Sequence, residues 1–302
     1  MTWRDLALAR PALGALLPLG GGGQGKIFRL PEFHLAEVPV PLIYKEYRET
    51  SGGVAPQGVA NVITLRAAVA REQQPWFDSH LVWPLRLVVD DLDAADATVA
   101  GIVMRLIPGA FFTELRLGGE THRVPREARF LFLDRRDAAQ RGLDFPDLAA
   151  RLLLCQRLAY LIAFLHRNDI VFGDISSRNV LYCLAPTPDV LLVDCDAVRK
   201  VGSAPVVAQG HAPDFMPPNP RSPQSITTDL FKLGLFVIRA LSPGAVVTAD
   251  TAGRTAAGTL DRTGATLVAA SVGHDPAARP SALAWYRYFR SLTLLSLPVR
   301  GL

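Results

Sequence analysis

Cysteine, histidine at metal-binding spacing and long uncharged apolar runs are all scarce in this 302-residue sequence. The three cysteines, Cys155, Cys183 and Cys195, are too few and too scattered for a disulfide framework or a zinc site, so we expect core thiols in a reducing cytosol. The six histidines never fall at ligand spacing, and no G-x-S-x-G elbow occurs. These absences argue against a metalloenzyme and against an acyl-transfer enzyme.

Charge of a single sign is also lacking. The 32 basic and 28 acidic residues are interspersed and leave a net charge of only +4. The sequence therefore lacks the clustered positive charge that is typical of nucleic-acid-binding proteins. No segment reaches the ~18 uncharged apolar residues that span a bilayer, because Lys232 and Arg239 interrupt the most apolar helix candidate, Leu230–Leu241. Arg4 and Asp5 argue against a signal peptide. We therefore expect a cytoplasmic protein without a nucleic-acid or membrane partner.

Hydrophobic residues make up 49% of the chain, which is ample for a buried core, and they are organised differently in its two halves. The first half predicts short strands and one helix, Val59–Glu72. The strand candidates are Lys26–Leu30, Val40–Tyr47, His80–Val89 and Val99–Ile107. From Leu148 an apolar stripe predicts a buried helix that ends near His166. The turn dipeptide Pro108-Gly109 marks the boundary, and the Ala-, Gly- and Thr-rich stretch Ala245–Ala270 is expected to be loop or weak helix.

The first chemical motif is the glycine-rich run from Gly20 to Gly25. Its glycines satisfy G-x-G-x-x-G, and a backbone without side chains can close over phosphate oxygens with its N–H groups. A dinucleotide-binding fold would need a helix at the last glycine, but residues 27–30 continue as a strand, so a hairpin loop is predicted. Taken alone, the run is equally typical of a flexible turn.

A single lysine follows on a predicted strand. Lys45 ends the apolar run Leu42-Ile43-Tyr44. A buried ammonium needs an anionic partner, which nucleotide phosphates under the glycine loop would supply. The alternative is a lysine on the exposed face of an edge strand.

A polar loop that carries an aspartate and an asparagine comes next along the chain. Asp174 and Asn179 lie five positions apart between a helix and an apolar run, and Asp194 follows a second apolar run. One carboxylate of such a set can position a hydroxyl, while the amide and the other carboxylate can hold magnesium.

In order and spacing these motifs resemble the eukaryotic-like protein kinases, including bacterial ones, of the protein kinase-like superfamily. The resemblance implies an α+β fold with two lobes that form one domain: residues 1–108 as an antiparallel β-sheet lobe with one helix, and residues 109–302 as a mainly helical lobe. It implies binding of ATP and Mg²⁺. It assigns catalysis to Asp174, Lys45 and Arg178, metal binding to Asn179 and Asp194, and support of the catalytic loop to a buried Asp229. The nucleotide-binding residues it implies are Gly20, Gly22, Gly23, Gly25, Ile27, Lys45, Met104 and Leu106.

The sequence also departs from the kinase pattern. Phe172-Gly173-Asp174 replaces H-R-D, Asp194-Cys195-Asp196 lacks the Phe and Gly of D-F-G, and Ser176 stands where a catalytic-loop lysine is usual. The helix after Lys45 has no central glutamate, and Glu72 lies late. Three functions stay open: an active kinase of protein Ser, Thr or Tyr hydroxyls; a nucleotide-binding pseudokinase that acts as a regulatory scaffold for a protein partner; and a small-molecule phosphotransferase of the antibiotic-kinase type.

Overall fold

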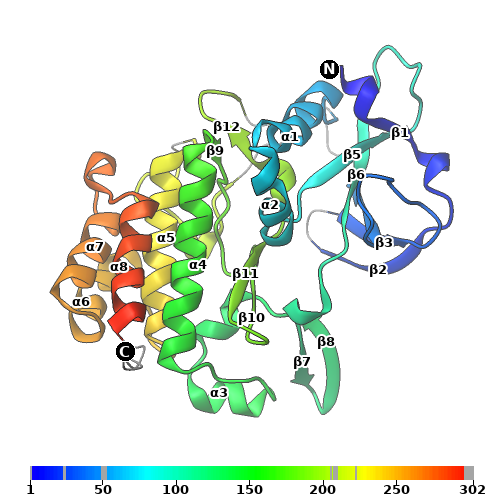
Figure 1. Cartoon of the computed structure of the whole chain (residues 1–302). Helices are drawn as coiled ribbons and strands as arrows, with labels where there is room; N and C mark the ends of the chain where they lie inside the picture. The colour runs from blue at the N-terminus through cyan, green and yellow to red at the C-terminus, as the bar shows by residue number, and fades with distance from the viewer. Residues whose placement is uncertain are drawn as a thin grey trace, which may run out of the picture. The chain divides into compact units, whose positions relative to one another are not determined.

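The structure is a computed structural model, which describes residues 2–22, 25–48, 53–204, 206, 210–221 and 223–295. The chain is a mixed α+β protein of two compact units (Figure 1). Unit 1 comprises Met1–Ile107 and Val193–Ala208, and unit 2 comprises Pro108–Leu192 and Gln209–Leu302. Residues 193–208, which the sequence assigned to the second half, thus belong with the first half.

Unit 1 is built on a six-stranded sheet in the order β1-β5-β6-β4-β3-β2. Its strands are β1 (Ala7–Ala9), β2 (Leu17–Gly22), β3 (Gly25–Leu30), β4 (Leu42–Tyr47), β5 (Pro84–Val89) and β6 (Val99–Arg105). Neighbours are antiparallel except β1 and β5, which pair in parallel, so the sheet is mixed where a wholly antiparallel one was predicted. The prediction missed β1 because three residues are too short to show an alternating pattern.

Two helices accompany this sheet, α1 (Pro56–Ala68) and α2 (Gln74–His80), where one was predicted. Pro56 opens α1, as proline favours the first helical turn, and Val69 adopts an extended backbone that ends it. The predicted strand His80–Val89 is shorter than expected, since its first residue closes α2. A 3-10 helix, η6 (Cys195–Ala197), and the short strand β12 (Arg199–Lys200) come from the second segment of unit 1.

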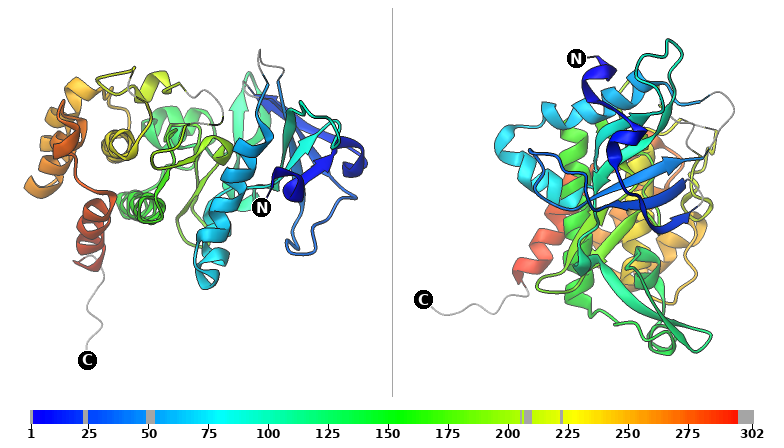
Figure 2. Two further views of the ribbon diagram at one scale, coloured as in Figure 1. Left: turned by 90° about the horizontal axis from the view of Figure 1, so that it is seen from above. Right: turned by 90° about the vertical axis from the view of Figure 1, so that its right-hand side faces the viewer.

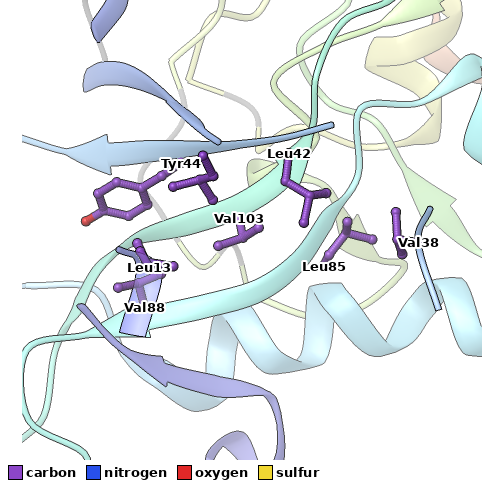
Figure 3. Packing of buried hydrophobic residues seen from close by; sticks show 8 residues of the cluster. Leu13, Val38, Leu42, Tyr44, Leu85, Val88 and Val103 are labelled. Carbon is purple, nitrogen blue, oxygen red and sulfur yellow. The ribbon is translucent and has the colours of Figure 1, made fainter. Parts of the chain in front are cut away.

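One face of the sheet carries a hydrophobic core (Figure 3). Its buried members are Leu13, Leu30, Val38, Leu42, Tyr44, Leu85, Val88 and Val103. Successive strand residues point to opposite faces. Leu42 and Tyr44 of β4 point into this core, so Lys45, the next residue along the strand, lies on the opposite face.

Unit 2 is mainly helical. Its helices are α3 (Arg135–Gln140), α4 (Leu148–Arg167), α5 (Ile226–Leu241), α6 (Ala249–Thr259), α7 (Arg262–Val272) and α8 (Ala282–Leu295). Helix α4 packs against α5 and α8, and α7 packs against α5 and α6, as the views of Figures 1 and 2 show. Unit 2 also holds the hairpins β7 (Phe112–Leu117) with β8 (Glu120–Pro125) and β10 (Val180–Cys183) with β11 (Asp189–Leu192), and the short strand β9 (Ile170–Val171).

The helices of unit 2 test two sequence predictions. The helix expected from Leu148 to about His166 is confirmed as α4. The stretch expected to be loop or weak helix contains α6 and most of α7, because each has a side-chain N-cap: Thr248 accepts from Thr251 N, and Asp261 accepts from Gly264 N at 2.7 Å.

Helix α4 is the one helix of the described residues that is long and apolar enough to cross a membrane, by length and composition alone. Half of its apolar window is buried inside the structure, and a core helix passes the same test. It was not foreseen as such a candidate because Arg151 and Arg157 interrupt its apolar residues.

Candidate functional site

Lys45 lies in the middle of β4, on the sheet face opposite the hydrophobic core. The strand register puts it across from Ile27 of β3 and Ile102 of β6, and Ile27 across from Gly20 of β2. Directly opposed residues share a face, so these four residues form a row across four strands. Met104, two positions after Ile102, lies on the same face. Four residues predicted to bind nucleotide, Gly20, Ile27, Lys45 and Met104, are thereby gathered on one surface.

The ammonium group of Lys45 is held by two carboxylates. Its Nζ donates to Asp194, and to Oδ1 and Oδ2 of Asp196 at 3.1 and 3.0 Å. Lys45 is 5% exposed and Asp196 is 4% exposed. The hydroxyl of Tyr47 also donates to Oδ2 of Asp196, at 2.8 Å. Burial lowers the pKa of Lys45, but the charges of Asp196 and Asp194 outweigh it, so the pKa lies above its usual value and the lysine stays charged.

Asp196 is a site residue that the sequence reasoning did not identify. Glu72, the helical candidate for pairing with Lys45, lies in the 3-10 helix Arg71–Gln73 and is exposed. Asp196 lies in η6 and supplies a buried carboxylate in its place. The sequence did contain a signal for this role: Asp196 is a second acidic residue just after the apolar run that leads to Asp194. An acidic residue so close to a buried run needs a cationic partner, because carboxylates are rarely buried unpaired.

The backbone at Asp194 has a left-handed conformation, with φ 63° and ψ 40°. This conformation costs roughly 1–2 kcal/mol for a residue with a side chain, although Asp tolerates it better than most. The turn leads directly into η6, whose Asp196 contacts the same ammonium as Asp194. Strain of this kind is concentrated at functional sites.

The glycine-rich run forms a hairpin, which confirms the prediction. Strands β2 and β3 are antiparallel, with Gly22 opposite Gly25. Gly20 has φ 136°, a value that side chains disfavour, and a Cβ on Gly25 would lie 2.1 Å from the carbonyl oxygen of Glu46. The backbone itself therefore requires glycine at these two positions. Gly23, also predicted to bind nucleotide, lies outside the described residues.

Met104 and Leu106, the remaining two residues predicted to bind nucleotide, both make contacts within unit 1. Met104 is buried and pairs with Ile43 across β6 and β4. The N–H of Leu106 donates to the carbonyl of Pro41 at 2.9 Å. The amide of Leu106 is thus used within unit 1, and a role for it in holding adenine stays a prediction.

In unit 2, Asp174 and Asn179 are brought together in the loop between β9 and β10. Nδ2 of Asn179 donates to the carbonyl oxygen of Asp174 at 3.1 Å and to its Oδ2 at 2.7 Å. Oγ of the buried Ser176 accepts from the backbone N–H of Asn179 at 3.2 Å, which fixes the turn. Within the described residues, the amide oxygen Oδ1 of Asn179 has no hydrogen-bond donor.

Arg178, predicted to be catalytic, is exposed in the same loop. Burial raises the pKa of Glu127, and the charges of Arg129 and Arg178 oppose that rise. The guanidinium of Arg178 therefore acts electrostatically on Glu127, and its catalytic role stays a prediction.

A buried carboxylate of α5 supports this loop. Asp229 has no exposed surface and accepts from the backbone N–H groups of Phe172 at 2.9 Å and Gly173 at 2.8 Å. It also accepts from Nε2 of His166, at 3.1 Å. Ser225 caps the start of α5, which places Asp229 in the first turn, where the helix dipole favours a negative charge. The predicted role of Asp229 as a support for the loop backbone is confirmed.

A second buried charge of α5, Lys232, was noted in the sequence only as an interruption of an apolar helix. Its Nζ donates to the carbonyl of Gly173 at 2.7 Å and lies 3.8 Å from Oδ1 of Asp174. Burial raises the pKa of Asp174, and Lys232 and the hydrogen bond from Asn179 oppose that rise. Burial lowers the pKa of Lys232, and the charges of Asp174, Asp229 and Asp214 oppose that fall.

Comparison with protein-family models gave no match, and comparison with curated proteins gave none either. Within the described ranges, no three His, Cys, Asp or Glu side chains are grouped to hold a metal ion. Magnesium is usually bound by only one or two carboxylates, with waters and phosphate oxygens completing its shell. The carboxylate of Asp194 in unit 1 and, separately, the amide oxygen of Asn179 in unit 2 are hard oxygen atoms of the kind that magnesium takes.

Proposed function

We propose that the chain is a divergent member of the protein kinase-like superfamily that transfers the γ-phosphoryl group of ATP to a hydroxyl of a protein substrate. One observation carries the proposal. Lys45 and Asp194, 149 positions apart, converge on the sheet face that also carries Gly20 and Ile27. A kinase-like fold with two lobes belongs to the same proposal, as does a cytoplasmic location; residues 193–208 then count with the first lobe, as they do with unit 1.

The proposed reaction moves one phosphoryl group. The oxygen of the substrate hydroxyl forms a bond to the γ-phosphorus, and the bond from that phosphorus to the β,γ-bridging oxygen breaks. ADP leaves with the electron pair of the broken bond, and the hydroxyl proton passes to the carboxylate of Asp174. Positioning and charge neutralisation supply most of the catalysis in such a transfer.

The remaining residues divide between phosphate and metal binding. Lys45 is a permanent cation for the α and β phosphates, because its pKa is held above the usual value. Asp194 and Oδ1 of Asn179 are the oxygens that would bind Mg²⁺, which supplies charge neutralisation on the phosphates when bound. Asp174, positioned by Asn179, would orient the hydroxyl.

A second candidate function is a nucleotide-binding pseudokinase that acts as a regulatory scaffold for a protein partner. The observation that favours it is the double contact of Asp196 with Lys45. An ammonium has three donors, and Asp194 with the two oxygens of Asp196 offers an acceptor for each. A phosphate would have to compete with these carboxylates.

Thermal unfolding with ATP, with and without magnesium, tests nucleotide binding. A ligand at about 100 times its Kd stabilises the folded state by roughly 2.7 kcal/mol. We expect ATP with magnesium to raise the Tm of the wild type and to leave the Tm of Asp194→Asn unchanged. Asp96→Asn, which removes an exposed carboxylate of the same unit, should behave as the wild type. No shift in the wild type at saturating ATP and magnesium would contradict nucleotide binding.

Transfer of labelled phosphate then separates the candidate functions. We expect incorporation into protein by the wild type and by Asp250→Asn, which changes an exposed aspartate of α6, and none by Asp174→Asn. Binding of ATP without incorporation into protein would instead support the pseudokinase. Transfer to free hydroxylated antibiotics in place of protein would identify a small-molecule phosphotransferase.

A further inference from the structure

Lys232 lies in an unusual place for a charged residue. It is fully buried in α5, between Phe231 and Leu233, which are also fully buried. An ammonium in such surroundings is strongly unfavourable unless other groups compensate its charge, and an apolar side chain would fill the same space at no such cost. The contacts of Lys232 must therefore offset its burial.

These contacts all concern the loop that carries Asp174. Of its three possible donors, Nζ uses one for a hydrogen bond to a described residue, the 2.7 Å bond to the carbonyl of Gly173. The carboxylate oxygen Oδ1 of Asp174 lies 3.8 Å away. That oxygen is buried and accepts no hydrogen bond from the described residues, whereas Oδ2 is held by Asn179 at 2.7 Å. One oxygen of Asp174 thus faces an amide and the other faces the charge of Lys232.

The loop itself supplies no comparable charge. Ser176, two positions after Asp174, is buried, and its hydroxyl is used in the turn to Arg178 and Asn179. Arg178 is exposed. A helix residue therefore provides the positive charge that the loop sequence lacks.

We infer that Lys232 is a positioning residue for the proposed phosphoryl transfer: its ammonium, bound to the carbonyl of Gly173 and 3.8 Å from Oδ1 of Asp174, holds the Asp174 side chain in place. The role in transfer rests on the proposed function, in which Asp174 orients the substrate hydroxyl. Because Lys232 is fully buried, it contacts neither nucleotide nor substrate.

The first test does not depend on any activity. Melting temperatures are measured for Lys232→Met, Asp174→Asn and the double variant, with Leu233→Met as the packing control on the same helix. Methionine keeps the length of the side chain and removes its charge. We expect Asp174→Asn to lower the Tm of the wild type and to raise the Tm of Lys232→Met, because the carboxylate has lost its compensating charge in that background.

Equal Tm shifts from Asp174→Asn in both backgrounds would overturn the inference. If Lys232→Met alone does not fold, recovery of folding in the double variant supports the coupling, and failure to recover contradicts it. Leu233→Met should leave the effect of Asp174→Asn as it is in the wild type.

The second test uses phosphate transfer. We expect Lys232→Met to lower kcat by about 10–100-fold, the loss typical of a misplaced catalytic group, with KM for ATP within about twofold of wild type. Lys232→Arg, which keeps the charge, should retain more activity than Lys232→Met. An unchanged kcat in folded Lys232→Met would refute the positioning role. If the wild type transfers no phosphate at all, the proposed function fails, while the melting temperatures still decide whether Lys232 and Asp174 are coupled.

Discussion

Replacement of Asp196 by asparagine should destabilise the protein strongly, because it breaks a buried ion pair with Lys45. The Asp196 carboxylate is 4% exposed and accepts two hydrogen bonds from Lys45 and one from Tyr47. Breaking a buried ion pair costs about 3–5 kcal/mol, because the remaining charge stays buried. Asp194 continues to neutralise Lys45, so we expect the lower end, a loss of about 3 kcal/mol in the free energy of unfolding.

Urea unfolding of matched variants measures this loss. Tyr47→Phe removes only the hydroxyl that donates to Asp196 and should cost about 1 kcal/mol. Asp96→Asn, at an exposed position, serves as the neutral control. The slope of the free energy against urea should stay unchanged, so that midpoints report stability. A loss for Asp196→Asn no larger than that for Tyr47→Phe would refute the reasoning that Lys45 depends on Asp196.

Three further predictions concern other parts of the structure. Gly25→Ala should lower the free energy of unfolding in urea by about 1–3 kcal/mol, because its Cβ would lie 2.1 Å from the carbonyl oxygen of Glu46. Gly253→Ala, in α6 with open space around it, should instead raise that free energy by roughly 0.5–1 kcal/mol. Changes of the same sign for both variants would contradict the packing argument. Asp229→Asn should lower the free energy of unfolding by about 2–3 kcal/mol, since an amide cannot accept from all three donors, and an unchanged melting curve would show that the loop does not need this carboxylate. Burial raises the pKa of four tyrosines in the folded protein, to about 12 for Tyr44 and Tyr182. Their protonated forms therefore contribute stability that is complete below the unfolded pKa of about 10, and this stability is lost as the pH rises from there. Tyrosinate absorbance in an alkaline titration should therefore rise together with unfolding, and ionisation of all the tyrosines near pH 10 in the folded protein would contradict this; the four are Tyr44, Tyr47, Tyr182 and Tyr288.

Local patterns in the sequence were sufficient for much of the secondary structure. The apolar stripe from Leu148 predicted α4, and the runs around Lys26 and Lys45 predicted β3 and β4. The glycine run predicted a hairpin because its last glycine leads into a strand. Periodicity and turn chemistry act over a few residues, so a single sequence can reveal them. The parallel strand β1 escaped because three residues carry no period.

For the charged residues, too, part of the result came from the sequence and part only from the tertiary structure. In the sequence, residue type and order along the chain gave a resemblance to protein kinases, and that resemblance assigned Lys45, Asp174, Asn179, Asp194 and Asp229 to one kind of site. Only the tertiary structure decided which charges are buried against each other. Asp196 became the second partner of Lys45 across 151 positions, and Lys232 came to lie beside Asp174 from a helix whose apolar pattern gave no reason to expect a functional lysine. The physical reason is that burial and pairing of charges depend on contacts between segments far apart in the chain, which composition, periodicity and spacing do not contain.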